Sequence, residues 1–423
     1  MDKPVYHRDT CRLCDSHHVE LVLKLAECPP VDAFVPAERL GEKQSLFPMD
    51  LYLCHECGHG QLLDVVSPRL LFGDYIYTTA SSPGLVKYFG DYAAKVLSQL
   101  NLTPGAAALD IGSNDGTLLR FFKERGLKVL GVDPASEIAA AATLGGIETL
   151  PDFFNSKIAT TIRQERGAFD LVTANNVFAH SDQLGDMADG VRILLAPAGV
   201  FVFEVSYLLD MMRNMVFDFI YHEHLSHHSV KPLQRFLAAH GLNLFHVETT
   251  PSKGGTLRCF AQLDGGPLPI DPSVARLIES EVDAGLYRRE TYDAWAARIN
   301  KAKQDLNAEL ARSQAAGRKI AGYGASATGT VITYHFEIGA TLDFLIDDNP
   351  LRQNRYSPGH HTAVLSSRAL SERKPDDVVI LVWRFADMIV ARNREFLDQG
   401  GRFIVPLPDL RIIDRNTPLP AAA

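Results

Sequence analysis

The hydrophobic positions between residues 84 and 135 follow first a helical and then a mixed pattern. The segment 84–102, GLVKYFGDYAAKVLSQLNL, carries apolar residues at helical spacing. Residues 106–135, AAALDIGSNDGTLLRFFKERGLKVLGVDPA, read as strand, glycine-bearing turn, helix and strand, and the helix has an apolar face that includes Leu118 and Phe122. This order predicts a β-α-β unit, in which two parallel strands share one sheet.

The same sheet is predicted to continue downstream. Residues 169–183, FDLVTANNVFAHSDQ, contain a strand that runs into a polar loop, and residues 194–209 contain a helix end, a turn and another strand. A helix near 231–242 follows, with two strands near 244–250 and 256–263. We therefore expect a doubly wound, Rossmann-like sheet in the middle of the chain.

A second α/β pattern occupies the C-terminal part. From about Asp271 to Ala316 the chain is helical, with acidic and basic residues interleaved, and residues 318–336, RKIAGYGASATGTVITYHF, read as strand, Gly-x-Gly turn and helix. Gly322 and Gly324 could hold an anionic group at the helix start, although a turn that only packs strand on helix explains them equally well. Further buried strands are predicted in 342–350, 376–383 and 401–408.

Size and charge narrow the function classes. A chain of 423 residues with 46% hydrophobic residues can form two or three domains with buried cores. The 42 Lys and Arg against 51 Asp and Glu give a net charge of −9, and no basic block indicates nucleic acid. The charged start, MDKPVYHRDT, has no apolar signal region, and no apolar run approaches the roughly 18 residues of a membrane span. We expect a cytoplasmic protein that acts on a small molecule, and no protein partner is evident.

Four of the six cysteines form two CxxC pairs, which predict a structural Zn²⁺ site. Two such turns can bring four thiolates together in a closed tetrahedron that leaves no open position for a substrate. A reducing cytosol disfavours two disulfides, and the repeated spacing disfavours unpaired buried thiols. A set of three cysteines and a histidine, using His55 or His59, stays open. The predicted ligands are Cys11, Cys14, Cys54 and Cys57.

The turn DIGSNDG after the first strand of the Rossmann-like sheet favours S-adenosylmethionine over a dinucleotide. Asn114 stands where a G-x-G-x-x-G motif has its second glycine. Its side chain would keep a pyrophosphate from approaching the backbone closely. Asp133 ends the next strand, where a carboxylate can accept hydrogen bonds from both ribose hydroxyls. A dinucleotide, or a glycine turn without a ligand, remains the alternative. The predicted cofactor-binding residues are Asp110, Gly112, Asn114, Asp115, Gly116, Asp133 and Asn175.

Residues 221–229, YHEHLSHHS, hold four of the 15 histidines. The H-E-x-x-H motif of zinc proteases fails here, because the required histidine at position 226 is a serine. Three readings remain: another metal set, polar residues at the surface and a helix start, or a general base, since a neutral imidazole can remove a proton from carbon.

The chain resembles, over essentially its whole length, the sugar C-methyltransferases of deoxysugar pathways. The resemblance is carried, in this order, by CRLC, CHECGHGQ, YIYTTASSPG, LDIGSNDGTLL, NNVFAHSDQ, YHEHLSHHS, KGGTLRCF, GYGASATG and IDDNPLRQNRYSPG. It implies an α/β protein with an N-terminal zinc-binding domain (1–72), a central S-adenosylmethionine-dependent methyltransferase domain (73–268) and a helical linker with a C-terminal doubly wound domain (269–423). Together the domains would surround a nucleoside-diphosphate 4-ketosugar.

The resemblance also implies the active-site residues. His224 matches the family's base, Tyr221 and Glu223 match its neighbours, His180 matches the histidine of the NNVxAH loop, and Tyr75 matches a tyrosine of the loop after the zinc domain. The base would form an enolate at C3 or C5, next to the 4-keto group, and the enolate carbon would attack the sulfonium methyl group. The sequence departs from the family at WRFADMIV (383–390) and at RQNRYSPGHH, which leaves the exact sugar and nucleotide open.

Other function classes fit the residues less completely. An O- or N-methyltransferase would use the same cofactor fold, and a zinc-ribbon protein could use that fold for interaction alone. Asp347 and Asp348 end a strand in the C-terminal domain, where an acidic residue also suits a ribose. An NAD site there, or a fused oxidoreductase, is a further alternative.

Overall fold

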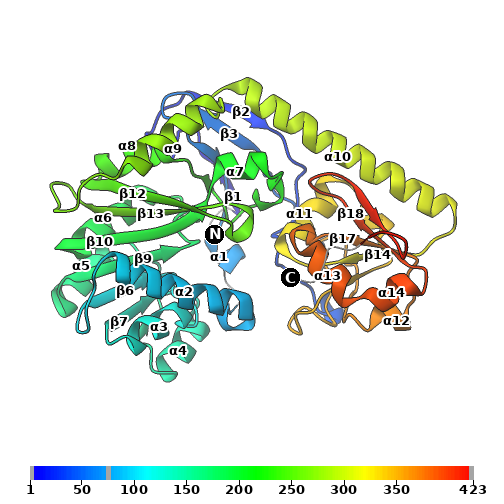
Figure 1. The fold of residues 1–423 in the computed structure, drawn as a ribbon, viewed down its shortest axis with the longest axis horizontal. Helices are drawn as coiled ribbons and strands as arrows, with labels where there is room; N and C mark the ends of the chain where they lie inside the picture. The colour runs from blue at the N-terminus through cyan, green and yellow to red at the C-terminus, as the bar shows by residue number, and fades with distance from the viewer. Residues whose placement is uncertain (1–3, 73–77, 419–423) are drawn as a thin grey trace.

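The computed structural model describes residues 4–72 and 78–418, and in them the strands form four sheets (Figure 1). A seven-stranded sheet lies on the left of Figure 1 and a six-stranded sheet on the right, while the N-terminal strands lie between and above them. The protein is therefore of the α/β class, as the sequence predicts. No helix among these residues has both the length and the apolar character to cross a bilayer.

The seven-stranded sheet is the Rossmann-like one. Its order is β12-β13-β10-β9-β6-β7-β8, with β10, β9, β6, β7 and β8 parallel and β13 and β12 antiparallel at one edge. The strands are β6 (Ala107–Ile111), β7 (Lys128–Val132), β8 (Thr149–Leu150), β9 (Phe169–Asn175), β10 (Leu195–Ser206), β12 (Leu242–Thr250) and β13 (Thr256–Leu263). The helices are α2 (Pro83–Gln99), α3 (Thr117–Glu124), α4 (Ser136–Leu144), α5 (Ser156–Arg166), α6 (Leu184–Leu194), α7 (Leu208–Arg213) and α8 (Val230–Ala239).

The six-stranded sheet, order β16-β15-β14-β17-β18-β19, is parallel except for β19. Its strands are β14 (Ile320–Tyr323), β15 (Phe344–Ile346), β16 (Val364–Leu365), β17 (Asp377–Ile380), β18 (Arg402–Val405) and β19 (Arg411–Ile413). The associated helices are α10 (Arg289–Ala315), α11 (Ala327–His335), α12 (Ala369–Glu372), α13 (Ala386–Arg392) and α14 (Arg394–Asp398), with the short turn η6 (Trp383–Phe385). Helix α9 (Pro272–Asp283) instead packs on β12 of the seven-stranded sheet.

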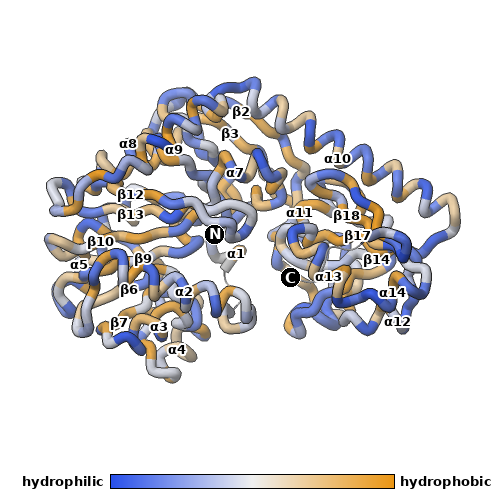
Figure 2. Tube along the Cα trace, in the orientation of Figure 1, coloured by the Kyte–Doolittle hydropathy of each residue, from blue (hydrophilic) through white to orange (hydrophobic). Residues whose placement is uncertain are grey.

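Helix α10 links the two halves of the molecule along one side (Figure 1). Its buried residues recur at spacings of three and four, as Trp295, Ile299, Ala302 and Leu306 do, so one stripe faces the protein. Polar residues alternate with this stripe, whereas the strands of both sheets are largely hydrophobic (Figure 2). The helical pattern predicted for 271–316 is thus confirmed as two helices, α9 and α10.

The N-terminal residues form a small antiparallel sheet of order β11-β4-β3-β2 and a separate β1-β5 pair. These elements are β1 (Val5–His7), β2 (Val19–Leu23), β3 (Leu51–Cys54), β4 (Gly60–Leu62), β5 (Asp64–Val66), β11 (Ser226–His227) and the helix α1 (Pro68–Phe72). Strand β11 comes from YHEHLSHHS, which pairs with β4 at Ser226–Gln61 and His227–Gly60. The histidine segment therefore joins the zinc-binding region to the Rossmann-like sheet, which the sequence analysis did not predict.

Candidate active site

The four paired cysteines converge on one point. Their sulfur atoms all lie within 4.8 Å of one another, with Cys11 Sγ 3.6 Å from Cys57 Sγ and Cys14 Sγ 3.6 Å from Cys54 Sγ. A tetrahedron with Zn–S distances of about 2.3 Å has edges of about 3.8 Å, whereas a disulfide bond measures about 2.05 Å. The set therefore has the geometry of a tetrathiolate zinc site.

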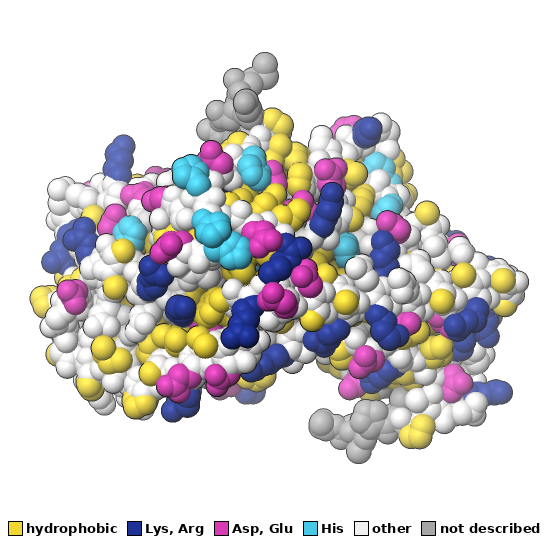
Figure 3. Space-filling model, turned by 90° about the horizontal axis from the view of Figure 1, so that it is seen from above, with side chains coloured by type: hydrophobic (Ala, Val, Ile, Leu, Met, Phe, Trp, Pro, Cys, Tyr) yellow, Lys and Arg dark blue, Asp and Glu magenta, His cyan; other side chains and the backbone are white. Residues whose placement is uncertain are grey.

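The two nearby histidines are not part of this set. His55 Nε2 lies 2.7 Å from Glu20 Oε2, and His59 Nε2 lies 3.2 Å from Ser226 Oγ. Exposed histidines His17 and His18 also occur in this domain, and histidines gather on the surface seen in Figure 3. Among the described residues, the cysteine group is the one set of side chains arranged to hold a metal ion.

The turn between β6 and α3 has the backbone that a cofactor cradle needs. Gly112 and Gly116 have φ of 67° and 75°, and an added Cβ would lie 2.4 Å from Val177 Cγ2 and 2.9 Å from Ile147 Cγ2, respectively. Both positions therefore require glycine. The turn lies at the carboxyl ends of parallel strands β6 and β9, where open α/β sheets bind their ligands.

Three side chains at these strand ends have acceptors or donors available for a ligand. The Asp133 carboxylate accepts one hydrogen bond at each oxygen, from Asn114 N at 2.8 Å and Ala135 N at 2.9 Å, so each oxygen retains a second acceptor position. Burial raises the pKa of Asp110 to about 7. Neither the oxygen nor the nitrogen of the buried Asn175 amide has a hydrogen-bond partner among the described residues. This arrangement fits S-adenosylmethionine, as predicted.

The side chains of Asn114 and Asp115 have protein partners that the sequence did not predict. Asn114 Oδ1 accepts a hydrogen bond from Thr79 N at 2.8 Å, and Asp115 Oδ2 accepts one from Ala80 N at 2.8 Å. Asp115 Oδ1 also accepts from Thr117 Oγ1 at 2.6 Å. These contacts fix the segment before α2 on the glycine turn, so the two residues shape the cofactor site partly through the backbone they hold.

We predict that Asp133→Ala weakens S-adenosylmethionine binding by roughly 10- to 150-fold, because losing a charge-assisted hydrogen-bond acceptor costs about 1.5–3 kcal/mol. Isothermal titration of the purified protein measures this. The matched control is Asp170→Ala, which removes a carboxylate that accepts from Ala107 N at 2.8 Å, at the amino end of β6. Equal affinity in Asp133→Ala and wild type would show that the ribose lies elsewhere.

The segment YHEHLSHHS is largely buried, so its reading as surface residues is wrong. Its last residue, Ser229, does stand at the N-cap of α8, but the Ser229 side chain forms no capping hydrogen bond. His222, His227 and His228 are 1%, 1% and 0% exposed. His222 Nε2 donates to the Phe47 carbonyl at 3.1 Å and His228 Nε2 to the Phe178 carbonyl at 3.0 Å. His227 and His228 therefore belong to the core that joins the domains.

His224 is held in one tautomer. Its Nδ1 lies 2.6 Å from the carbonyl oxygen of Phe219, and since a carbonyl can only accept, Nδ1 carries the proton. In the neutral ring the lone pair is then on Nε2. Burial lowers the pKa of His224 to about 4, which the hydrogen bond to Phe219 partly opposes, so the ring is neutral at physiological pH.

Three of the predicted catalytic residues gather around His224. The Tyr221 and His180 rings lie 4.1 Å and 5.1 Å from the His224 ring, measured between centroids. Glu223 is buried, and burial raises its pKa to about 8, so this carboxyl group is protonated at neutral pH and can donate a hydrogen bond. The fifth candidate, Tyr75, lies outside the described residues.

Lys253 is a cation in this cluster that the sequence analysis did not identify. It lies in the KGGT motif with a φ of 52°, and its charge interacts with Glu223, His224 and His180. The side chain reaches solvent, yet the protein around it removes enough water to lower the pKa of its ammonium group to about 8. In the sequence, the available signal was the place of Lys253 in a motif already quoted for its family resemblance.

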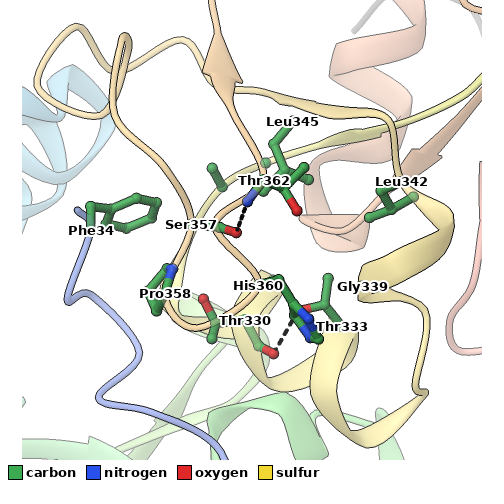
Figure 4. A pocket seen from close by; sticks show the side chains of 13 residues that line it. Phe34, Thr330, Thr333, Gly339, Leu342, Leu345, Ser357, Pro358, His360 and Thr362 are labelled. Atoms are coloured by element: carbon green, nitrogen blue, oxygen red, sulfur yellow. Dashed lines mark hydrogen bonds between the residues drawn. The ribbon is translucent and has the colours of Figure 1, made fainter. Parts of the chain in front are cut away.

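The Gly-x-Gly turn of the C-terminal domain is closely packed. An added Cβ would lie 2.6 Å from Leu345 Cδ2 at Gly322 and 2.5 Å from Val382 Cγ1 at Gly324, so packing alone requires both glycines. A narrow recess beside the turn is lined by this domain and by Phe34 of the N-terminal domain (Figure 4). Its polar side chains are those of Thr330, Thr333, Ser357, His360 and Thr362.

Comparison with known proteins agrees with this architecture. Family models match a zinc binding domain over residues 11–72, a methyltransferase domain over 87–247 and a C-methyltransferase C-terminal domain over 251–408. C-methyltransferase NovU of Streptomyces niveus is 32% identical over 413 residues, which cover 97% of this chain and 98% of NovU.

Other known proteins are similar to a smaller share of the chain. A ubiquinone biosynthesis O-methyltransferase of Rhodopseudomonas palustris is 28% identical over 127 residues, or 29% of this chain and 49% of that protein. The PH0226 protein from Pyrococcus horikoshii is 15% identical, covers 44% of this chain and 95% of its own, and has a TM-score of 0.37.

The fold and the site define an S-adenosylmethionine-dependent methyltransferase with a cysteine-rich zinc-binding region. The chain belongs to the C-methyltransferase family of which NovU is a member, and it is an S-adenosylmethionine-dependent C-methyltransferase.

Proposed function

We propose that the enzyme methylates C3 or C5 of a nucleoside-diphosphate 4-ketosugar through an enolate. The observation that carries this proposal is the His224 imidazole, whose Nδ1–H is fixed on the Phe219 carbonyl at 2.6 Å and whose Nε2 can therefore accept a proton. Forming a carbon nucleophile requires such a base. A hydrogen on the carbon next to a carbonyl group is only weakly acidic, and a base in contact with it is needed to remove it. Oxygen and nitrogen nucleophiles carry lone pairs of their own.

The low pKa of His224 is compatible with its role as the base, because the reaction itself forms the negative charge that stabilises the protonated ring. Among the described residues no carboxylate pairs with the ring, and burial disfavours its charged form. When Nε2 takes the proton from carbon, a negative enolate forms beside the new imidazolium. The two charges then stabilise each other in the transition state and not in the ground state, which is the requirement for catalysis.

Two neighbouring groups can stabilise the enolate oxygen. Protonated Glu223 can donate a hydrogen bond, and Lys253 supplies a positive charge in the same cluster. The His180 ring stacks on the His224 ring and the Tyr221 ring lies tilted against it, so both can keep it aligned with the substrate carbon. Bound S-adenosylmethionine supplies the electrophilic methyl group, and the protein has then to hold carbon, methyl and sulfur in line.

The zinc site has a structural role in this proposal. Its four thiolates leave no position for a substrate oxygen. Reduced cysteines of this kind also support the expectation of a cytoplasmic enzyme.

The pH dependence of the reaction should reflect these groups. We predict a rate that falls below about pH 4, where His224 becomes protonated, and falls again above about pH 8, where Lys253 loses its positive charge and Glu223 its proton. Lys253→Met should lower kcat by 10-fold or more below about pH 8, because it removes a preorganised charge, and its difference from wild type should shrink above that pH. A single-turnover pH profile measures both effects, and an acid limb between pH 6 and 7 would contradict the assignment of His224.

The substrate class is tested by a mass-spectrometric screen of nucleoside-diphosphate 4-ketosugars with S-adenosylmethionine. The expected result is a gain of one methyl group, with a carbon–methyl correlation at C3 or C5 in the product's NMR spectrum. Corresponding sugars with a hydroxyl group at C4 are the control and should not react. A methyl group on oxygen or nitrogen would overturn the proposal.

A further inference from the structure

A carboxylate just before the histidine segment is bound by the C-terminal domain. Asp218, in the short turn η3 (Phe217–Phe219), is 0% exposed. Its oxygens accept hydrogen bonds from Trp383 Nε1 at 3.1 Å and from Arg384 Nη1 at 3.2 Å and 3.1 Å. Both donors lie in η6, in the stretch WRFADMIV that departs from the family pattern.

Arg384 makes a second contact in the same turn. Its guanidinium carbon lies 4.5 Å from the centroid of the Phe219 ring, a cation–π geometry. Gly254, next to Lys253, leaves room for this side chain, since an added Cβ there would lie 3.3 Å from Arg384 Cδ. The arginine thus holds both the carboxylate of Asp218 and the ring of Phe219.

Phe219 is the residue whose carbonyl fixes His224. The turn is also held by Phe336, which directly follows α11 and whose ring stacks on Phe217 with centroids 5.4 Å apart. A shift of η3 would move the Phe219 carbonyl and break its 2.6 Å hydrogen bond with Nδ1. The ring could then exchange between its two tautomers, and only one of them has its lone pair on Nε2.

We propose that Trp383 and Arg384 are positioning residues for His224, so that the C-terminal domain sets the orientation and tautomer of the base in the methyltransferase domain. The catalytic consequence rests on the proposed role of His224. The structural consequence does not, because the tautomer of the ring can be observed without any reaction. Asp218 is the link: a buried carboxylate requires its partners, and removing them releases the turn.

The test compares Arg384→Met, Arg384→Lys and Trp383→Phe with the control Arg318→Met. Arg318 also pairs with a buried carboxylate of the C-terminal domain, Asp377, at 2.8 Å, and among the described residues it forms no hydrogen bond or ion pair with η3. Spectra of ¹⁵N-histidine-labelled protein, with the His224 signal identified by its loss in His224→Asn, report the tautomer. Titration with S-adenosylmethionine and single-turnover methylation report binding and the chemical step.

In wild type and in Arg318→Met we expect a single Nδ1–H tautomer. Arg384→Met should show a mixture of tautomers and a kcat about 10- to 100-fold lower, since small misplacements of catalytic groups have effects of this size. Its affinity for S-adenosylmethionine should stay within about twofold of wild type. Arg384→Lys keeps the charge and Trp383→Phe keeps the arginine. The tautomer ratio and the kcat of both variants should therefore lie between those of wild type and Arg384→Met.

Two outcomes would overturn the proposal. One is an unchanged His224 tautomer in folded Arg384→Met and Trp383→Phe. The other is an equal change in Arg318→Met, which would indicate a general loosening of the C-terminal domain. If the tautomer changes as expected while methylation is unaffected, the positioning contact stands and the role of His224 as the base is refuted instead, so the two claims fail separately.

Discussion

Replacing His224 with asparagine is expected to lower the rate of methyl transfer by about 10²- to 10⁴-fold, the usual contribution of a general base. Asparagine keeps a donor near the Phe219 carbonyl but cannot take the substrate proton. The affinity for S-adenosylmethionine and for the nucleotide sugar should be nearly unchanged, because the imidazole acts mainly on the transition state. Single-turnover assays and calorimetry on the purified variant separate the two effects.

Neighbouring substitutions provide the controls. His227→Asn and His228→Asn should lower stability, since both side chains are buried, but folded protein should retain most of its activity. Tyr221→Phe and Glu223→Gln should show intermediate losses. Added Zn²⁺ should not rescue His224→Asn, and rescue by metal would revive the reading of this segment as a metal site.

Replacing Cys11 with serine is expected to remove the zinc and destabilise the protein strongly, because structural zinc binding contributes about 10–16 kcal/mol in zinc-finger peptides. The effect should reach the active-site segment through Arg12, which lies inside the first CxxC turn. Arg12 Nη1 donates to the Leu225 carbonyl at 2.9 Å, and Arg12 Nε lies 2.9 Å from Asp182 Oδ1. Elemental analysis and thermal unfolding measure zinc content and stability.

Cys28→Ser is the matched control for this change. Cys28 is also fully buried, but it lies outside the tetrathiolate set. This variant should keep about one zinc per chain and lose far less stability than Cys11→Ser. Wild-type protein without stoichiometric zinc, purified in the absence of chelator, would contradict the metal assignment.

Much of the fold follows from local sequence patterns. The run Ala106–Ile111 predicted the first strand of the Rossmann-like sheet, which is β6, and KPLQRFLAAHGL predicted the helix α8. The CxxC spacing predicted the tetrathiolate set without any knowledge of its partners in space, because two adjacent ligands and a turn form a local motif. The strand, the helix and each single CxxC pair depend on residues close together in the chain.

The remaining features depend on contacts between distant segments. Nothing in YHEHLSHHS indicates that Ser226 pairs with Gln61, 165 positions earlier, and this pairing is what buries the segment. The Arg384–Asp218 contact joins residues 166 positions apart. An arginine and a buried aspartate have no periodic pattern that would reveal their partner, so their role emerges only once the domains are packed together.

The central claim is that the enzyme makes a carbon nucleophile by removing a proton through His224. Hydrogen exchange in D₂O tests it most directly, with a nucleoside-diphosphate 4-ketosugar, S-adenosylhomocysteine in place of the methyl donor, and proton NMR to follow the hydrogen next to the carbonyl. The account predicts that wild-type enzyme replaces this hydrogen with deuterium and that His224→Asn does not. Exchange at the wild-type rate in His224→Asn would contradict it.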